Sequence, residues 1–431
     1  MIAFLPFLVV ALALLGAVHW YVWRRLVRDV TAAGGPARRV GTAVVVALPL
    51  LSVAALASGR AGAPFLFQQV VAWPGFLWLA VLLYLVLALA VGEAVRPLLT
   101  RWLARRAAAA PAPEPVPVPA PAPVPVPERT AEAEPEAEAA PEAETGDVVE
   151  RPVASEVSRR LFVARVVGGA AAAAAAGTVA NGAYGVLRGP RVKRVTVPLA
   201  KLPRAAHGYR IAVVSDIHLG PILGRAHSQR IVDAINATQP DLIAVVGDLV
   251  DGTVENLGPA AEPLARLRAR HGSFFVTGNH EYFSGADAWV DHVRELGMRP
   301  LRNERLEIPA GFDLAGVDDV AGESEGRGPD FARALGDRDR SRTAVLLAHQ
   351  PVVIDDAVAH GVDLQLSGHT HGGQLWPGNL LAELANPTVA GLERYGDTQL
   401  YVSRGAGAWG PPVRVGAPSD ITVVQLASKQ A

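Results

Sequence analysis

Three long uncharged stretches near the start of this chain limit the folds that are open to it. They cover residues 1–23, 40–58 and 70–92 and contain no Asp, Glu, Lys or Arg. A helix needs roughly 20 apolar residues to cross the hydrocarbon core of a bilayer. Buried helices of a soluble core are the alternative, but the arginine-rich flanks favour membrane spans. The sequence therefore predicts a helical transmembrane region over residues 1–106.

The distribution of arginine predicts the orientation of these spans. The segment from Arg24 to Arg39 is basic, whereas residues 58–69 contain a single charged residue, Arg60. Four more arginines follow the third span, at positions 96, 101, 105 and 106. Because loops rich in Lys and Arg stay in the cytoplasm, we expect the N-terminus outside and both basic segments inside.

Two segments of biased composition connect this region to the rest of the chain. Residues 107–157 alternate Pro with Ala and Val and then turn to Glu and Ala, which predicts an extended and then disordered linker. Residues 158–189 begin with Arg159-Arg160 and continue as an Ala/Gly/Val run. This run resembles a twin-arginine export signal, and an ordinary fourth span is the alternative. Both interpretations place the C-terminal half outside the cytoplasmic membrane, whereas a helix that only packs on a surface would leave it in the cytoplasm.

From residue 190 to residue 431, short β-branched runs alternate with helical stretches. Strands are expected at Tyr209–Val214, Asp241–Val246 and Thr343–Ala348, and one of the helices at Pro259–Arg270. This pattern predicts an α/β or α+β layered sandwich. Several of the apolar runs end in polar motifs, which are Asp216-Ile217-His218, Gly247-Asp248 with Asp251, Gly278-Asn279-His280-Glu281, His349, and Gly368-His369-Thr370-His371. Because an α/β sheet presents its ligand-binding residues at the carboxyl ends of its strands, we expect these side chains to lie together.

The residue types in these motifs point to divalent cations. Carboxylate, amide and imidazole groups bind Mn, Fe or Zn, and the absence of cysteine excludes a thiolate site. Side chains two residues apart on a turn can converge on one cation, and Asp248 after a glycine is the natural bridge between two. Asn279 would be a neutral ligand that limits the negative charge. Two cations about 3.5–4 Å apart can clamp the phosphoryl oxygens of an in-line displacement.

In this order the motifs resemble the calcineurin-like metallophosphoesterase family, with its pattern D-x-H, G-D, G-N-H-E, H and G-H-x-H. The resemblance covers about residues 195–426 and implies a site with two divalent cations, which could be Mn, Fe or Zn. It implies that one cation is held by Asp216, His218, Asp248 and His371, and the other by Asp248, Asn279, His349 and His369. It also implies that His280 acts beside the leaving group, as general acid or charge stabiliser, and that Asp251 orients it.

Departures from the family pattern narrow the range of possible substrates. Gly252 stands where the protein phosphatases of this superfamily carry an arginine, which argues against a phosphoprotein. The runs GNHEYFSG and GHTHGGQLWP resemble the membrane-associated bacterial branch, which implies a phosphodiester or pyrophosphate in a lipid-linked or cell-envelope molecule, such as a UDP-diacylglucosamine-type lipid. The net charge of −1 gives no indication of a nucleic-acid partner.

Three alternatives stay open at this point. The enzyme could be a phosphomonoesterase, because the walls of the pocket decide between esters. The domain could instead serve a non-catalytic membrane sensor or scaffold, although none of the motifs is missing. A transporter-like role for the spans is disfavoured, because they lack intramembrane charges apart from Glu93 at one end.

Overall fold

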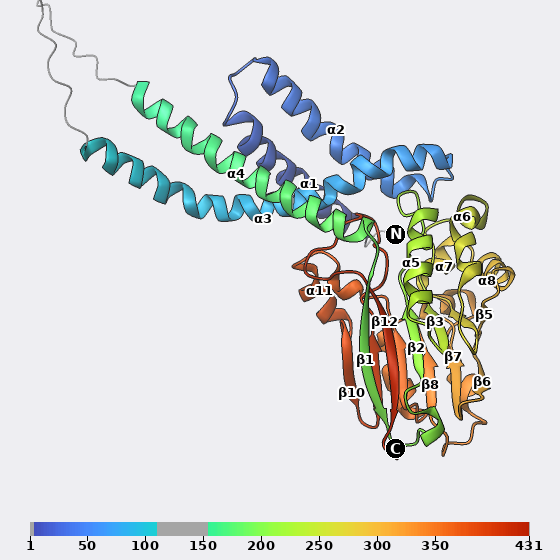
Figure 1. Cartoon of the computed structure of the whole chain (residues 1–431). Coiled ribbons are helices and arrows are strands. Elements are labelled where there is room, and N and C mark those ends of the chain that lie inside the picture. Colours follow the sequence, from blue (N-terminus) through green and yellow to red (C-terminus); the bar gives the residue numbers. More distant parts are fainter. Residues whose placement is uncertain (1–3, 110–153, 431) are drawn as a thin grey trace, which may run out of the picture.

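The N-terminal region forms four helices, and the rest of the chain forms a β-sandwich (Figure 1). The computed structural model describes residues 4–109 and 154–430. Most of the predicted linker, residues 110–153, lies outside the described ranges. The helices are α1 (Phe4–Trp23), followed by a π-helical turn (Arg24–Arg28), α2 (Pro36–Ser58), α3 (Phe65–Ala109) and α4 (Ala154–Leu187).

Helices α2, α3 and α4 pack closely at positions where a glycine lies in the contact. A Cβ on Gly75 of α3 would lie 2.8 Å from Cβ of Ala55 in α2, and one on Gly92 would lie 2.6 Å from Val167 in α4. Among the described residues, three helices are long and apolar enough to cross a membrane, namely Pro36–Ser58, Phe65–Ala109 and Arg159–Leu187. Much of the surface of α2 exposes Val and Leu, which suits a lipid environment better than water.

The C-terminal half contains two six-stranded sheets. In spatial order, the first sheet holds β1 (Arg191–Leu199), β12 (Asp420–Ser428), β2 (Arg210–Val214), β3 (Leu242–Val246), β4 (Ser273–Val276) and β5 (Arg299–Pro300). The second holds β10 (Gly391–Tyr395), β11 (Thr398–Val402), β9 (Leu364–Ser367), β8 (Ala344–Leu347), β7 (Phe312–Gly316) and β6 (Glu304–Ile308).

Apolar side chains between the two sheets form the central core. Ile211 and Val213 of β2 face residues such as Leu347 of β8 and Leu366 of β9, all fully buried. A second cluster lies between the first sheet and the helices α5 (Arg225–Ala237), α6 (Val254–Ala261) and α8 (Ala286–Glu295), and a third lies between the second sheet and α9 (Phe331–Leu335) and α10 (Ile354–Ala359). The domain is therefore a layered α/β sandwich, as the sequence predicted, and the structure adds that it has four layers.

Parallel pairing brings the polar motifs to one end of the sandwich. Strands β2, β3 and β4 are mutually parallel in the first sheet, and β8 and β9 are parallel in the second. Figure 1 shows the helices α1 to α4 gathered at one end of the sandwich, and the contacts described below place the motif loops at that same end.

Several elements differ from the prediction. A helix was expected over Pro259–Arg270, but α6 ends at Ala261 and a 3₁₀ turn (Glu262–Arg266) follows. Pro263 has no backbone N–H to continue the α-helical pattern, which explains the change. The edge strands β1, β6 and β10 were not predicted, because their many charged and exposed residues obscure the strand pattern. Two short helices complete the fold, α7 (Asn279–Ser284) and α11 (Gly378–Ala385).

Candidate metal centre

The loops that carry the predicted ligands have unusual backbone conformations. Asp216, His218, Asp248, His369 and His371 all have φ between 50° and 71°. They account for five of the eight non-glycine residues with positive φ in the described part of the chain. A left-handed conformation costs an ordinary side chain about 1 kcal/mol or more, and such strain is typically kept at functional sites. The left-handed backbone conformation thus orients these five side chains, and it does so at a cost in local stability.

The first group of converging side chains is Asp216, His218 and His371. The Nε2 atoms of His218 and His371 lie 3.0 Å apart, and Oδ1 of Asp216 lies 3.4 Å from Nε2 of His371. Two nitrogen ligands about 2.1 Å from one cation, at right angles to each other, would be separated by about 3.0 Å. The spacing of these atoms therefore fits a shared cation.

The second group is Asp248, His349 and His369. Nδ1 of His349 donates to the carbonyl of Val246 at 2.8 Å, which directs Nε2 toward Asp248. This buried Nε2 has no hydrogen-bond partner among the described residues and lies 3.1 Å from Oδ2 of Asp248. Asn279 joins the group, with its Oδ1 3.0 Å from Nδ1 of His369. A buried ring nitrogen that points at a carboxylate fits a metal ligand, because a cation would satisfy both.

Asp248 lies between the two groups. Its Oδ2 is 3.1 Å from Nε2 of His349 in the second group and 3.8 Å from Nε2 of His218 in the first. Its other oxygen accepts the backbone N–H of His280 at 2.9 Å. This position is the one that a carboxylate bridging two cations would need.

Burial and mutual charge shift the acidity of these groups. Burial raises the pKa of Asp216, whereas His349 and His218 hold the pKa of Asp248 below its usual range despite burial. Burial, together with the charge of His349, lowers the pKa of His369 to about 4. Burial and the neighbouring His218 lower the pKa of His371 well below its usual value. His369 and His371 are therefore neutral at pH 7, which is the form that binds metal.

Asp251 connects the first group to His280. Its Oδ1 lies 2.9 Å from Nδ1 of His218 and 2.6 Å from Nδ1 of His280. Burial would raise the pKa of Asp251, but the two imidazoles lower it to about 2, so the carboxylate is ionised. A carboxylate on Nδ1 fixes the ring orientation and leaves Nε2 for the chemistry. The sequence predicted this pairing for His280 but not for His218.

Glu281 holds the loops of this region together. Its buried carboxylate accepts the backbone N–H groups of Gly278 at 2.6 Å, Leu249 at 2.7 Å and Asp248 at 3.0 Å. Burial and the nearby Asp248 raise its pKa to about 7. Gly278 is required beside it, because a Cβ there would lie 2.9 Å from Cδ2 of His349 and collide with Asp248. These three hydrogen bonds make Glu281 a support for the loops that carry the predicted ligands.

Arg414 is a residue near the site that the motifs did not predict. Its buried guanidinium donates to the backbone carbonyl of His371 at 3.0 Å and lies 3.1 Å from Nδ1 of the same ring. Burial lowers the pKa of Arg414 to about 10. It belongs to a Pro- and Gly-rich loop without a recognisable motif, so no pattern in the sequence could have identified it.

The chain is similar to several known proteins. The family described as calcineurin-like phosphoesterase matches residues 209–373. A Danio rerio protein named "Transmembrane protein with metallophosphoesterase domain" is 39% identical over 65% of this chain and 65% of its own length. A metallophosphoesterase of Helicobacter pylori strain J99 is 39% identical over 58% of this chain and 67% of its own. One from Aquifex aeolicus is 36% identical over 56% of this chain and 92% of its own. The match thus spans just under two thirds of the zebrafish protein.

Proposed function

Because this chain belongs to the calcineurin-like metallophosphoesterase family, we propose that it is a membrane-anchored hydrolase with two divalent cations that cleaves a phosphodiester or pyrophosphate. The observation that carries the proposal is the division of the predicted ligands into two groups with Asp248 between them. A sensor or scaffold with a decayed site would not need both groups complete.

The ligands divide between the two cations as the distances suggest. Asp216, His218 and His371 would hold one cation, His349, His369 and Asn279 would hold the other, and Asp248 would hold both. Cations bound there would act as Lewis acids toward the phosphoryl oxygens of the substrate. The neutral imidazoles and the Asn279 amide keep the ligand charge low, so the cations would remain strongly attractive to phosphate.

His280 would serve the leaving group. Its Nδ1 is held by Asp251, which leaves Nε2 to donate a proton or a hydrogen bond. Its ring also lines a cavity that opens beside the first ligand group, so a substrate can reach it. Such a positioned acid contributes typically 10²–10⁴-fold to the rate of a hydrolysis.

The substrate would be lipid-linked or part of the cell envelope, and a UDP-diacylglucosamine-type molecule is one example. What supports this is the location of the site at the end of the sandwich that meets the helices. Tyr84 of α3 donates to the carbonyl of Trp376 at 3.0 Å, close in sequence to the ligand His371. A phosphoester held in a bilayer would therefore be near the site.

We further propose that the catalytic domain lies outside the cytoplasmic membrane. The arginine-rich connection after α1, the end of α3 and the start of α4 share the side of the bundle away from the sandwich (Figure 1). Contacts among these segments agree, because Arg25 pairs with Glu93 at 2.6 Å and Arg165 donates to the carbonyl of Val30 at 3.2 Å. If basic segments face the cytoplasm, the sandwich faces the other side.

Metal content and hydrolysis test the function together. The full chain, purified in detergent, should contain divalent metal by elemental analysis and hydrolyse bis-p-nitrophenyl phosphate faster than p-nitrophenyl phosphate. Asp248→Asn should lose bound metal and activity, whereas Asp291→Asn, an exposed position on α8, should keep both. A parent protein without metal, or an Asp248→Asn protein with undiminished activity, would contradict the proposal. A preference for the monoester would favour the phosphomonoesterase alternative.

A further inference from the structure

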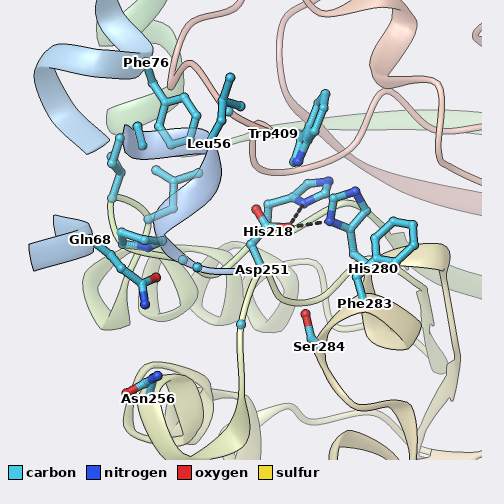
Figure 2. Close-up of a pocket in the computed structure, with 18 of the residues that line it drawn as sticks. Leu56, Gln68, Phe76, His218, Asp251, Asn256, His280, Phe283, Ser284 and Trp409 are labelled. Carbon is cyan, nitrogen blue, oxygen red and sulfur yellow. Dashed lines mark hydrogen bonds and ion pairs between the residues drawn. The ribbon is translucent and has the colours of Figure 1, made fainter. Parts of the chain in front are cut away.

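A cavity of about 250 Å³ lies between the sandwich and the hairpin formed by α2 and α3. His218, Asp251 and His280 line the catalytic end of the cavity. Leu56 of α2 and Phe76 of α3 line the opposite end, as Figure 2 shows. The cavity thus joins the candidate catalytic residues to the surface of two helices that are apolar enough to cross a membrane.

The walls between these two ends are mainly apolar and aromatic. Trp409 and Phe283 are 52% and 66% exposed, although they stand beside the catalytic ring. The ring centroid of His280 lies 5.8 Å from that of Trp409 and 5.5 Å from that of Phe283. Exposed aromatic side chains at the mouth of a site offer apolar area that a ligand can cover.

Few charged side chains line the cavity. Among the described residues that line it, Asp251 and Arg60 are the only ones with a carboxylate, ammonium or guanidinium group. Asp251 is already bonded to two imidazoles. Apart from His218 and His280, the remaining lining residues are uncharged. Gln68, Thr253, Asn256 and Ser284 supply polar groups, but most of the lining surface is apolar, which favours a hydrocarbon segment as the ligand.

The hairpin is held firmly against the sandwich. Ser52 of α2 donates to the carbonyl of Gly75 in α3 at 2.7 Å, which fixes the neighbouring Phe76. Phe65, at the start of α3, packs against the core cluster between the first sheet and its helices. A Cβ on Gly410 would lie 3.8 Å from Phe76, so the loop that carries Trp409 also touches the hairpin. The wall contributed by the helices is thus part of the folded site.

We propose that this cavity is a subsite for the hydrocarbon chain of an amphiphilic phosphoester, and that the α2–α3 hairpin is part of the substrate-binding site as well as a membrane anchor. This inference rests on the proposed function. The phosphoryl group lies at the ligands, and the chain runs past Trp409 and Phe283 toward Leu56 and Phe76. Each methylene that the cavity takes from water raises the apparent affinity for the reacting complex by up to about fourfold.

A chain-length series tests the subsite in the full-length protein. The substrates are p-nitrophenyl phosphodiesters whose second ester group is methyl, butyl or octyl, and kcat/KM is measured in nanodiscs. We expect kcat/KM to rise with chain length by at least tenfold from methyl to octyl. A parent that hydrolyses none of them refutes the proposed function. A parent that hydrolyses all three equally well retains that function and refutes the subsite.

Variants separate binding in the cavity from partitioning of longer substrates into the bilayer. The double variant Leu56→Ala/Phe76→Ala removes the far wall and should lower the octyl-to-methyl ratio of kcat/KM about tenfold. The matched control Leu50→Ala/Phe67→Ala changes the same residue types on the same helices at positions that do not line the cavity. It should keep the ratio of the parent. Equal ratios in both double variants would overturn the proposal, and if the first variant does not fold, the same comparison is made with Leu56→Ala alone.

Discussion

At the scale of single residues, the shared carboxylate of Asp251 determines how two histidines can act. His218 and His280 both direct Nδ1 at the same oxygen, at 2.9 and 2.6 Å. The Nε2 of His218 faces the first ligand group, at 3.0 Å from that of His371. His280 also lines the cavity, but it belongs to neither ligand group that contains Asp216 or Asp248. Two imidazoles with the same partner thus receive different roles from their positions.

This difference gives a test of His280. His280→Ala should lower the turnover of bis-p-nitrophenyl phosphate by about 10²-fold or more, because a positioned acid is lost. The metal content should stay at the parent level, since this side chain holds no cation in the proposed site. Elemental analysis and steady-state kinetics on the same preparation measure both. Parent-like activity would show that His280 does not assist the leaving group.

The buried side chain of His227 should make the free energy of unfolding depend on pH. Burial lowers the pKa of His227 in α5 to about 3, and neither ring nitrogen has a hydrogen-bond partner among the described residues. In the unfolded chain the same ring has a pKa of about 6.5. Between these values the unfolded state binds a proton that the folded state does not, so stability falls as pH falls from 6.5 toward 3.

His227→Leu should remove that sensitivity. At pH 5 the parent loses about 2 kcal/mol through this group, at about 1.4 kcal/mol per pH unit below 6.5. Thermal unfolding of the full chain in detergent at pH 7.5 and pH 5 measures the effect. The drop in Tm between the two pH values should be smaller in His227→Leu than in the parent. An identical drop in both proteins would mean that His227 can take up a proton in the folded state.

At the scale of elements, helix α4 and the loop that carries Arg414 form a direct contact between the bundle and the site. The backbone N–H of Arg414 donates to the carbonyl of Gly182 at 3.3 Å, and the same residue donates to the carbonyl of His371 at 3.0 Å. Val413 belongs to the apolar cluster of the helices. The position of a predicted ligand therefore depends on how α4 packs.

Adding a side chain at Gly182 tests this dependence. A Cβ there would lie 2.7 Å from Val413 and 2.8 Å from the carbonyl oxygen of Arg414, so Gly182→Val should displace the loop. Metal affinity and activity should fall together, each by about tenfold if the shift costs about 1.4 kcal/mol. Gly185→Val on the same helix is the control, because a Cβ at that position meets no atom within 4 Å. If both variants bind metal as the parent does, the contact does not position His371.

At the scale of the whole molecule, the connections between the helices lie on two opposite sides of the bundle. The connection between α2 and α3 lies beside the catalytic domain, and the basic segments lie on the opposite side of the bundle (Figure 1). A bilayer around the helices would separate these two sides. The candidate site would then open at a membrane surface, close to any substrate that lies in the bilayer.

Reporter fusions test this orientation. An alkaline phosphatase, which is active only after export, should be active when fused after Ala431 and inactive when fused after Arg106. A reporter that works only in the cytoplasm should give the opposite pattern, because Arg106 ends a basic segment. Cytoplasmic reporter activity after Ala431 would place the catalytic domain inside and refute the proposed topology.

Local patterns predicted much of this protein. The alternation of apolar runs with polar ends predicted strands such as β2, β3 and β8 to within two residues of their observed bounds. The apolar stretches predicted helices where the structure has α2 and α3. These features depend on neighbouring residues, so the sequence by itself determines them. The same holds for the identity of the candidate ligands, because each lies within a few residues after the end of a strand.

The tertiary structure alone decided how the pieces meet. His218 and His371 are 153 positions apart and follow strands of different sheets, yet their ring nitrogens lie 3.0 Å apart. No local pattern reports how two sheets face each other, because that arrangement depends on side chains filling the space between them. The position of Arg414 and the cavity wall from the α2–α3 hairpin have the same origin. The chemistry of these side chains follows from their residue types, but their position at the site comes from packing between distant parts of the chain.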